Sequence, residues 1–449
     1  MTKNFIAIFL VIFFARFIQC DNNRKSFVVV LDPGHGGSYI QPQSIYGDKF
    51  NRISFRHSDS YRPGASYQDI WEQNQVYLMA VEVKRLLDLT QNETGREEFT
   101  KILHNYSNQK KFNFYRMEIL FSRVDGFFNN YNKIKNDVNG PYRLYDYHDY
   151  LKDKTMMGTI SRINALKPNL VVTMHLTSTK PKGYGGLNSV ITPGFTTYKK
   201  AIEYVKAKPI KRREIRKKFL AGPFRQWFLN GGRRDRFESF LTDAWIYFNG
   251  YWSIKNGLHA NLRRFRGFRH NMLTWNYSDS LGWEEKARLF PRQTSYSRDL
   301  RTFKLEGAFW QREQNQYESF RREGGYEKRG GDNFYASQEI LRFVRKGLLV
   351  NNIETVRTLP VMLNPYISTW SMPTYTNAIN AFLELGHLRN SHDFKRIIKY
   401  NKIYAQSIAV AIYSLFHKII LKRTSTSNMP RGKKINWKKY GNYFNEVVK

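Results

Sequence analysis

"VVVLDPGHGG", Val28–Gly37, joins four consecutive apolar residues to a turn of aspartate, proline, glycine and histidine. The apolar run is typical of a short strand that is buried on both faces. Proline and glycine then end the strand, and His35 is left at its carboxyl end. By itself His35 has two interpretations, an ordinary loop histidine or a functional one. The rest of the chain decides between them.

Strand and helix patterns alternate along both ends of the chain. EQNQVYLMAVEVKRLLDL, which starts at Glu72, repeats apolar residues at mostly helical spacing and predicts an amphipathic helix. Further strands are predicted at 117–121, 169–174, 187–191 and 381–385, and further helices at 160–166, from 336 onward and over 393–421. This alternation indicates an α/β fold, with a twisted, mostly parallel sheet flanked by helices.

The composition limits both the chemistry and the partners. The chain has 449 residues, is 41% hydrophobic and carries a formal net charge of +36. Such a charge attracts anions, which include nucleic acid, acidic lipid headgroups and cell-wall polymers. Cys20 is the single cysteine, so an internal disulfide framework and a cysteine-based zinc site are both excluded. Any metal ion has to be held by histidine, aspartate or glutamate.

The first twenty residues predict export. Lys3 precedes an apolar run from Phe5 to Phe14, which is the pattern of a secretory signal. A membrane anchor is the alternative, but Arg16 interrupts the run before it could span a bilayer. Cys20 lies where a lipoprotein would be acylated, although the three residues before it match that signal poorly, so lipid anchoring stays open. We therefore expect a periplasmic or cell-envelope protein, and no nucleic-acid partner.

Composition also divides the chain. We expect a signal peptide over 1–20, two parts of one core domain over 27–194 and 334–421, an insertion over 195–333 and a basic tail, mostly exposed or mobile, over 422–449. The insertion interleaves arginine with aromatic residues, as in ANLRRFRGFRH. Its aromatic residues are too frequent for simple disorder, so we expect an ordered subdomain.

Four residues combine into one candidate site. His35 and His175 each follow a predicted strand, and Glu72 begins the helix after the first strand. In open α/β sheets ligands bind beyond the carboxyl ends of the strands, and two histidines with one carboxylate suit catalytic Zn²⁺. Hydrolysis needs a further carboxylate to move protons. Glu384 is the candidate because a carboxylate in an apolar strand is costly unless it is paired, metal-linked or protonated. His387 is close enough in sequence to reach the same site.

Each residue also has a structural interpretation. His35 and His175 could be hydrogen-bonded strand-end histidines, Glu72 could be an acid favoured by the helix dipole, and Glu384 could be the buried partner of an arginine. Only their combination, in four fitting contexts, favours a metal site.

The same stretches resemble a known family. VVVLDPGHGG, EQNQVYLMAVEVKRLLDL, NLVVTMHLTS and AFLELGHLRNSHDF, in this order, are similar to the four signature blocks of zinc-dependent N-acetylmuramoyl-L-alanine amidases of the amidase_3 type. FSRVDGFF, from Phe121, resembles a fifth segment of that family. The resemblance implies that His35, Glu72 and His175 are ligands of Zn²⁺ and that Glu384 is the catalytic glutamate.

The chain also departs from the family. The loop between His35 and Glu72 is longer than usual, Leu-Thr-Ser follows His175 in place of Ala-Asn, and His387 replaces a phenylalanine. The insertion over 195–333 has no recognised counterpart. None of these departures removes an implied ligand, so they bear on substrate preference more than on the reaction.

The resemblance implies an activity and its partners. The enzyme would hydrolyse the amide between the lactyl group of N-acetylmuramic acid and the L-alanine of the stem peptide, in cell-wall remodelling or daughter-cell separation. Its partners would be peptidoglycan, an anionic envelope surface and an activator protein at the insertion. Asp32 is expected to orient His35 through the second ring nitrogen. The alternative is a non-catalytic envelope-binding protein on an amidase scaffold, which the charge of +36 would suit. The presence of Glu384 and all three ligands counts against it.

Overall fold

The computed structural model describes residues 26–35, 50–51, 56–57, 64–123, 147–149, 154–156, 159–192, 316–326, 329–367, 372–422 and 428–441. The predicted signal peptide, Cys20 and most of the predicted insertion lie outside these residues. Among the described helices, none combines the length and the apolar character needed to cross a bilayer.

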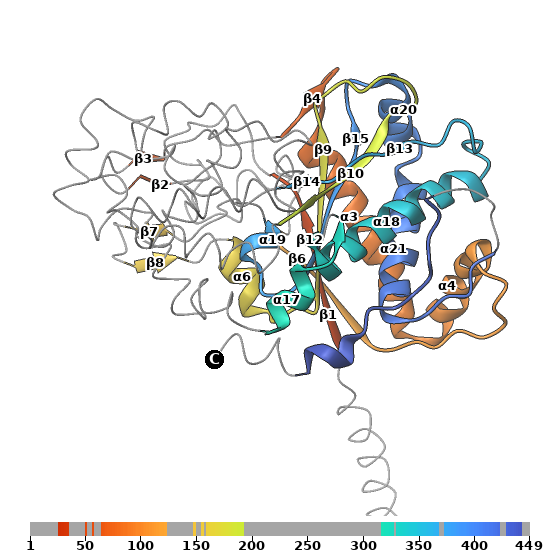
Figure 1. The fold of residues 1–449 in the computed structure, drawn as a ribbon, viewed down its shortest axis with the longest axis horizontal. Coiled ribbons are helices and arrows are strands. Elements are labelled where there is room, and N and C mark those ends of the chain that lie inside the picture. The colour runs from red at the N-terminus through yellow and green to blue at the C-terminus, as the bar shows by residue number, and fades with distance from the viewer. Residues whose placement is uncertain are drawn as a thin grey trace, which may run out of the picture.

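A seven-stranded sheet forms the centre of the fold (Figure 1). In spatial order its main path consists of β13 (Val361–Met362), β10 (Gly186–Ile191), β15 (Ile379–His387), β9 (Leu170–Thr177), β1 (Phe27–Pro33) and β6 (Met117–Phe121). The seventh strand, β14 (Tyr366–Ile367), also pairs with β10. The four strands β15, β9, β1 and β6 are mutually parallel, and β10 runs antiparallel to β15. The predicted mostly parallel α/β sheet is therefore confirmed.

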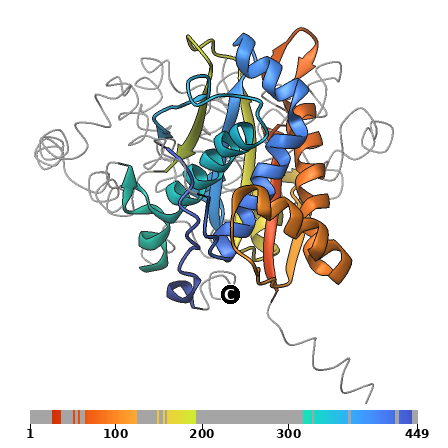
Figure 2. The same ribbon diagram turned by 90° about the vertical axis from the view of Figure 1, so that its right-hand side faces the viewer.

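Helices cover the sheet on both sides. Figure 2 shows α3 (Glu72–Asp88), α18 (Gly331–Val350) and α21 (Asn401–Phe416) across one face. The shorter helices α6 (Thr159–Ala165) and α19 (Met372–Tyr375) lie on the other side of the strands in Figure 1. The remaining described elements are α4 (Glu93–Tyr106), α17 (Gln316–Arg322), α20 (Ser391–Lys399), η1 (Leu89–Gln91), η2 (Trp437–Tyr440) and the short strand pairs β2–β3 (Phe50–Asn51, Arg56–His57), β4–β5 (Ser66–Tyr67, Ile70–Trp71), β7–β8 (Tyr147–Asp149, Lys154–Met156) and β11–β12 (Gly325–Tyr326, Arg329–Gly330).

Burial on both faces explains the apolar strands. Val29, Val30 and Leu31 of β1 are fully buried, as are Leu170–Val172 of β9. Strands covered by helices on both sides read as continuous apolar runs rather than as alternating ones. Between the helices, Gly347 of α18 faces Ser407 of α21 so closely that a Cβ would not fit. The glycine thus lets α18 and α21 pack closely against each other.

Several boundaries differ from the sequence prediction. The helical region over 393–421 is two helices, α20 and α21, which are separated at Tyr400. The helix expected from residue 336 begins at Gly331. The strand β9 continues to Thr177, so His175 lies within the strand and not after it, because parallel pairing with β15 extends through this residue.

Part of the predicted basic tail, within residues 428–441, packs against the core. Ile435 and Tyr440 are buried, and the Trp437 ring stacks on Phe416 with centroids 4.7 Å apart. The backbone N–H of Ile435 donates to Leu415 O at 2.9 Å. These apolar side chains are interleaved with lysines, so the lysines reach solvent while the apolar residues cover the end of α21.

Candidate metal centre

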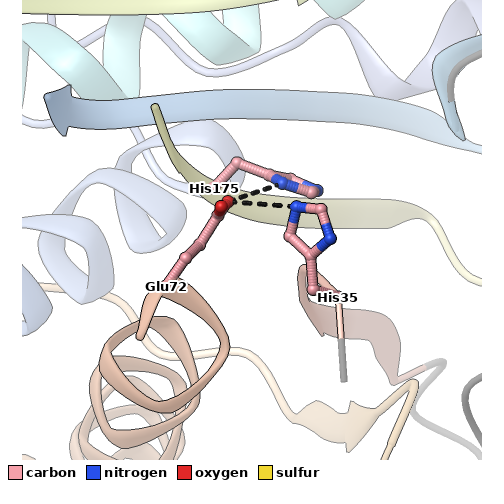
Figure 3. Close-up of side chains that lie close together, drawn as sticks. All are labelled: His35, Glu72 and His175. Atoms are coloured by element: carbon pink, nitrogen blue, oxygen red, sulfur yellow. Dashed lines mark hydrogen bonds and ion pairs between the residues drawn. The ribbon is translucent and has the colours of Figure 1, made fainter. Parts of the chain in front are cut away.

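His35, Glu72 and His175 converge at the carboxyl end of the sheet (Figure 3). Glu72 Oε1 lies 2.9 Å from His175 Nδ1 and 3.3 Å from His35 Nε2. The two imidazole rings have centroids 4.7 Å apart and planes at 77°. One donor atom from each residue lies within 4.8 Å of the other two. The structure thus brings together the three residues predicted from sequence, in a group that could hold a metal ion.

His35 is held by its backbone and by Arg123. Its φ of 63° is in the left-handed region, which non-glycine residues seldom adopt. Arg123, two residues after the end of β6, is buried, and its guanidinium donates to Pro33 O at 2.9 Å and to Gln73 O at 2.8 Å. The arginine therefore links the turn that carries His35 to the first turn of α3.

Glu72 is the first residue of α3 and is only 1% exposed. Its Oε2 accepts from the Ala65 N–H at 2.6 Å, and its Oε1 accepts from the Leu176 N–H at 2.8 Å. Burial alone would raise the pKa of Glu72, but His35 and His175 outweigh it and hold this pKa well below the usual range. Glu72 is therefore an oriented carboxylate, as a metal ligand requires.

Two glycines leave the space that the ligands occupy. A Cβ on Gly34 would overlap the imidazole ring of His175. A Cβ on Gly64, whose φ is +84°, would overlap the carboxylate of Glu72. On the far side, the His175 ring stacks on Phe382 of β15, with centroids 4.6 Å apart and planes at 8°. The ligand side chains are thus fixed by packing as well as by hydrogen bonds.

Glu384 lies next to this group, on the neighbouring strand. Its Cα pairs in parallel register with that of His175. Its Oε2 is buried with no hydrogen-bond partner, and no arginine forms an ion pair with it among the described residues. Burial, together with the negative charge of Glu72, raises the pKa of Glu384 well above its usual value. The alternative of an arginine-paired structural carboxylate therefore finds no support in the described part of the chain.

The other predicted candidates lie at the edge of the site. His387 is outside the three-residue group, and its Nδ1 lies 2.6 Å from Thr179 Oγ1. Asp32 Oδ1 accepts a hydrogen bond from Ser122 Oγ at 2.6 Å, so its described contact positions β6 against β1.

Three supporting residues had no role in the sequence prediction. Arg123 lies in the quoted FSRVDGFF segment, so its position was marked but its contacts were not. Phe382 sits two residues before Glu384, on the same face of β15. Gly64 lies eight residues before Glu72, in a polar loop, and nothing in the local sequence indicates that the chain turns back there to bring the two together.

Comparisons with known proteins give remote structural likenesses. No protein-family model matches the chain, and no curated protein matches its sequence. An N-acetylmuramyl-L-alanine amidase from Mycobacterium smegmatis is 11% identical, with a TM-score of 0.36 over 87% of this chain and 96% of that one. An N-acetylmuramoyl-L-alanine amidase from Clostridium difficile is 11% identical, with a TM-score of 0.29 and the same coverage. The catalytic domain of an amidase from Bacillus (Paenibacillus) polymyxa var. colistinus is 16% identical, with a TM-score of 0.17 over 40% of this chain and 62% of that one. At these values the likenesses add nothing to the site geometry described above.

Proposed function

We propose that this chain is a zinc-dependent N-acetylmuramoyl-L-alanine amidase of the cell envelope. The observation that carries the proposal is the convergence of His35, Glu72 and His175 beside Glu384, whose Oε2 is buried and has no hydrogen-bond partner. The resemblance of the four sequence blocks to this family supplies the substrate. The bond cleaved is the amide between the lactyl group of N-acetylmuramic acid and the L-alanine of the stem peptide.

The residues fit a zinc ion. Two imidazole nitrogens and one carboxylate oxygen form a donor set of catalytic zinc sites, which leave a further coordination position open. The low pKa of Glu72 keeps the carboxylate charged, and the hydrogen bond from Leu176 N orients it. When bound, a zinc ion would polarise a carbonyl group and lower the pKa of water.

Glu384 would move the proton that the reaction requires. Hydrolysis adds water to the scissile carbonyl, breaks the C–N bond and places one proton of the water on the leaving amine. A carboxyl group whose pKa is raised above its usual value can both accept and return that proton. Glu384 has this property because of its burial and its proximity to Glu72, and the strand β15 holds it beside His175.

The same function accounts for the proposed location. Peptidoglycan lies outside the cytoplasm, which agrees with the signal pattern over residues 1–20. The net charge of +36 suits a protein that works near anionic envelope polymers.

Digestion of purified peptidoglycan tests the proposal. The zinc-loaded protein is incubated with the wall, and the released products are identified by mass spectrometry. We expect stem peptides with a free N-terminal L-alanine, lost after chelation and recovered with added zinc. Tight wall binding without release, by protein that contains zinc, would support the non-catalytic alternative instead.

A further inference from the structure

A chain of hydroxyl groups ends on His387 beside the candidate metal centre. Thr179 Oγ1 lies 2.6 Å from His387 Nδ1 and 3.2 Å from Thr177 Oγ1. The backbone N–H of Thr179 donates to Thr177 Oγ1 at 3.2 Å. Thr179 is exposed and Thr177 is half-buried, whereas His387 is only 2% exposed. The hydroxyl groups therefore reach solvent while the imidazole lies behind them.

The strand register places the side chains of Thr177 and His387 on the same face of the sheet as His175. Residues two apart on a strand point to the same face, so Thr177 shares the face of His175. Glu384 pairs with His175 and His387 pairs with Thr177, with an irregularity between them on β15. Gly386, with a φ of +150°, lies at this bulge. A bulge of one residue returns the next side chain to the original face, which brings His387 back to the face of Glu384.

The surroundings of His387 indicate which of its nitrogens carries the proton. Its Nε2 is buried and has no hydrogen-bond partner. A buried N–H without an acceptor is rarer in proteins than an acceptor left unpaired. We therefore assign the proton to Nδ1, which donates it to Thr179 Oγ1.

A count of donors shows that the hydrogen-bonded group of Thr177, Thr179 and His387 has one donor without an acceptor. Thr177 and Thr179 each have one hydroxyl proton. Only one of these protons can lie in the contact between their two oxygens, and Thr177 Oγ1 already accepts from Thr179 N. Thr179 is the more exposed of the two, so we assign the proton between the oxygens to Thr177, and the hydroxyl proton of Thr179 is left to donate outward. The group therefore suits an acceptor oxygen, such as a carbonyl or a carboxylate.

We propose that Thr177 and Thr179, with His387 behind them, form a substrate-positioning subsite that donates a hydrogen bond to a carbonyl oxygen of the stem peptide. This inference rests on the proposed function. Thr177 lies two strand positions beyond His175, roughly 6.6 Å along the strand. That separation corresponds to about two residues of an extended peptide, so a stem peptide that continues along β9 past the scissile amide brings a distal carbonyl oxygen to this subsite.

Two substrates and three variants test the subsite. Thr179→Val removes the hydroxyl at nearly constant volume, and Thr179→Ser keeps it. Thr358→Val is the matched control, because Thr355 and Thr358 form an exposed hydroxyl pair with the same 3.2 Å separation away from this site. The substrates are N-acetylmuramoyl-tripeptide and N-acetylmuramoyl-L-alanine, which lacks the distal carbonyls.

Loss of one hydrogen bond predicts a rise in KM of roughly 3- to 10-fold for Thr179→Val on the tripeptide. We expect kcat to stay within about twofold, because the bond is made equally in the ground and transition states. Thr179→Ser and Thr358→Val should match the wild type, as should Thr179→Val on the short substrate. An unchanged KM on the tripeptide, a loss confined to kcat, or an equal loss on both substrates would overturn the subsite.

Binding separates this inference from the proposed reaction. Calorimetry measures the Kd of the tripeptide for Glu384→Gln with and without Thr179→Val. If the wild type does not hydrolyse the tripeptide but Thr179→Val still weakens binding 3- to 10-fold, the subsite stands and the proposed reaction falls. If hydrolysis occurs and neither KM nor Kd changes, the subsite falls alone. Absence of both hydrolysis and binding would overturn both.

Discussion

Glu384 and His175 are paired neighbours on the adjacent parallel strands β15 and β9. The candidate proton carrier and a candidate metal ligand are therefore fixed to each other by the central sheet and not by a loop. Glu72 reaches the same point from the first residue of α3 and contacts both histidines through Oε1.

Replacement of Glu72 by glutamine should remove most of the bound metal. The amide is neutral, so it no longer supplies the charge that His35 and His175 stabilise in the carboxylate, and neutral oxygen is a poor zinc ligand. We expect about one zinc per chain in the wild type and a small fraction of that in Glu72→Gln, measured by elemental analysis after gel filtration. Glu98→Gln is the control, since Glu98 is exposed and only 3.7 Å from Arg85 in a surface pair. Equal zinc content in the two variants would contradict the assignment.

Addition of a single methyl group at Gly34 should disturb the centre without unfolding the protein. The Cβ of Gly34→Ala would occupy the position of the His175 ring, so the imidazole has to move. We expect zinc affinity and hydrolysis to fall together while the circular dichroism spectrum is kept. Gly183→Asn serves as the comparison, because nothing lies within 4 Å of a Cβ there and asparagine tolerates its left-handed backbone. A Gly34→Ala protein with wild-type zinc affinity would show that His175 does not need this position.

Arg123→Lys should weaken the centre although it keeps the charge. The guanidinium bridges Pro33 O and Gln73 O, and the single ammonium group of lysine cannot reproduce that fork. Supporting contacts of this kind are typically worth about 10- to 100-fold in metal affinity. A competition titration with a zinc indicator measures the change. The exposed Arg85→Lys provides the matched control, and identical affinities in the two variants would refute the supporting role of Arg123.

The stability of the protein should depend on His417 at mildly acidic pH. The ring lies between Tyr115 and Tyr413 and is 6% exposed. Burial, with a smaller contribution from Lys434, lowers the pKa of His417 to about 4. The unfolded chain binds the proton more readily, so this group's contribution is complete above the unfolded pKa of about 6.5 and is lost as pH falls toward the folded value.

His417→Phe keeps the stacking and removes the titration. The free energy of unfolding of the wild type, relative to this variant, should fall by about 3 kcal/mol between pH 7 and pH 4. Urea denaturation at a series of pH values measures it. A difference that stays constant with pH would contradict the lowered pKa.

The sequence predicts the central elements because their apolar patterns are strong and local. The strand over Met117–Phe121 has the bounds that the pattern indicates, and the helix from Glu72 begins at that residue. The group of His35, Glu72 and His175 could be predicted because the two histidines follow predicted strands and the glutamate begins a predicted helix. The antiparallel direction of β10 could not be predicted in this way. A run of five buried residues has the same pattern in a parallel strand as in an antiparallel one.

The supporting contacts of the site depend on distances that no local pattern encodes. Arg123 and Gln73 are 50 positions apart, and Gly64 meets Glu72 only through the turn between β4 and β5. The folded part of the basic tail was missed for a related reason. Its lysines dominate the composition, whereas Trp437 and Tyr440 decide the packing.

The most direct test of the account is the rate of amide hydrolysis by Glu384→Gln at measured zinc content. Release of stem peptides with N-terminal L-alanine is followed by mass spectrometry for the wild type and the variant, each loaded to the same zinc stoichiometry. The account predicts a rate lower by about 10²- to 10⁴-fold in the variant, with zinc bound as in the wild type. A variant that cleaves at the wild-type rate, or that loses zinc together with activity, would contradict the role of Glu384 as the proton carrier beside the metal.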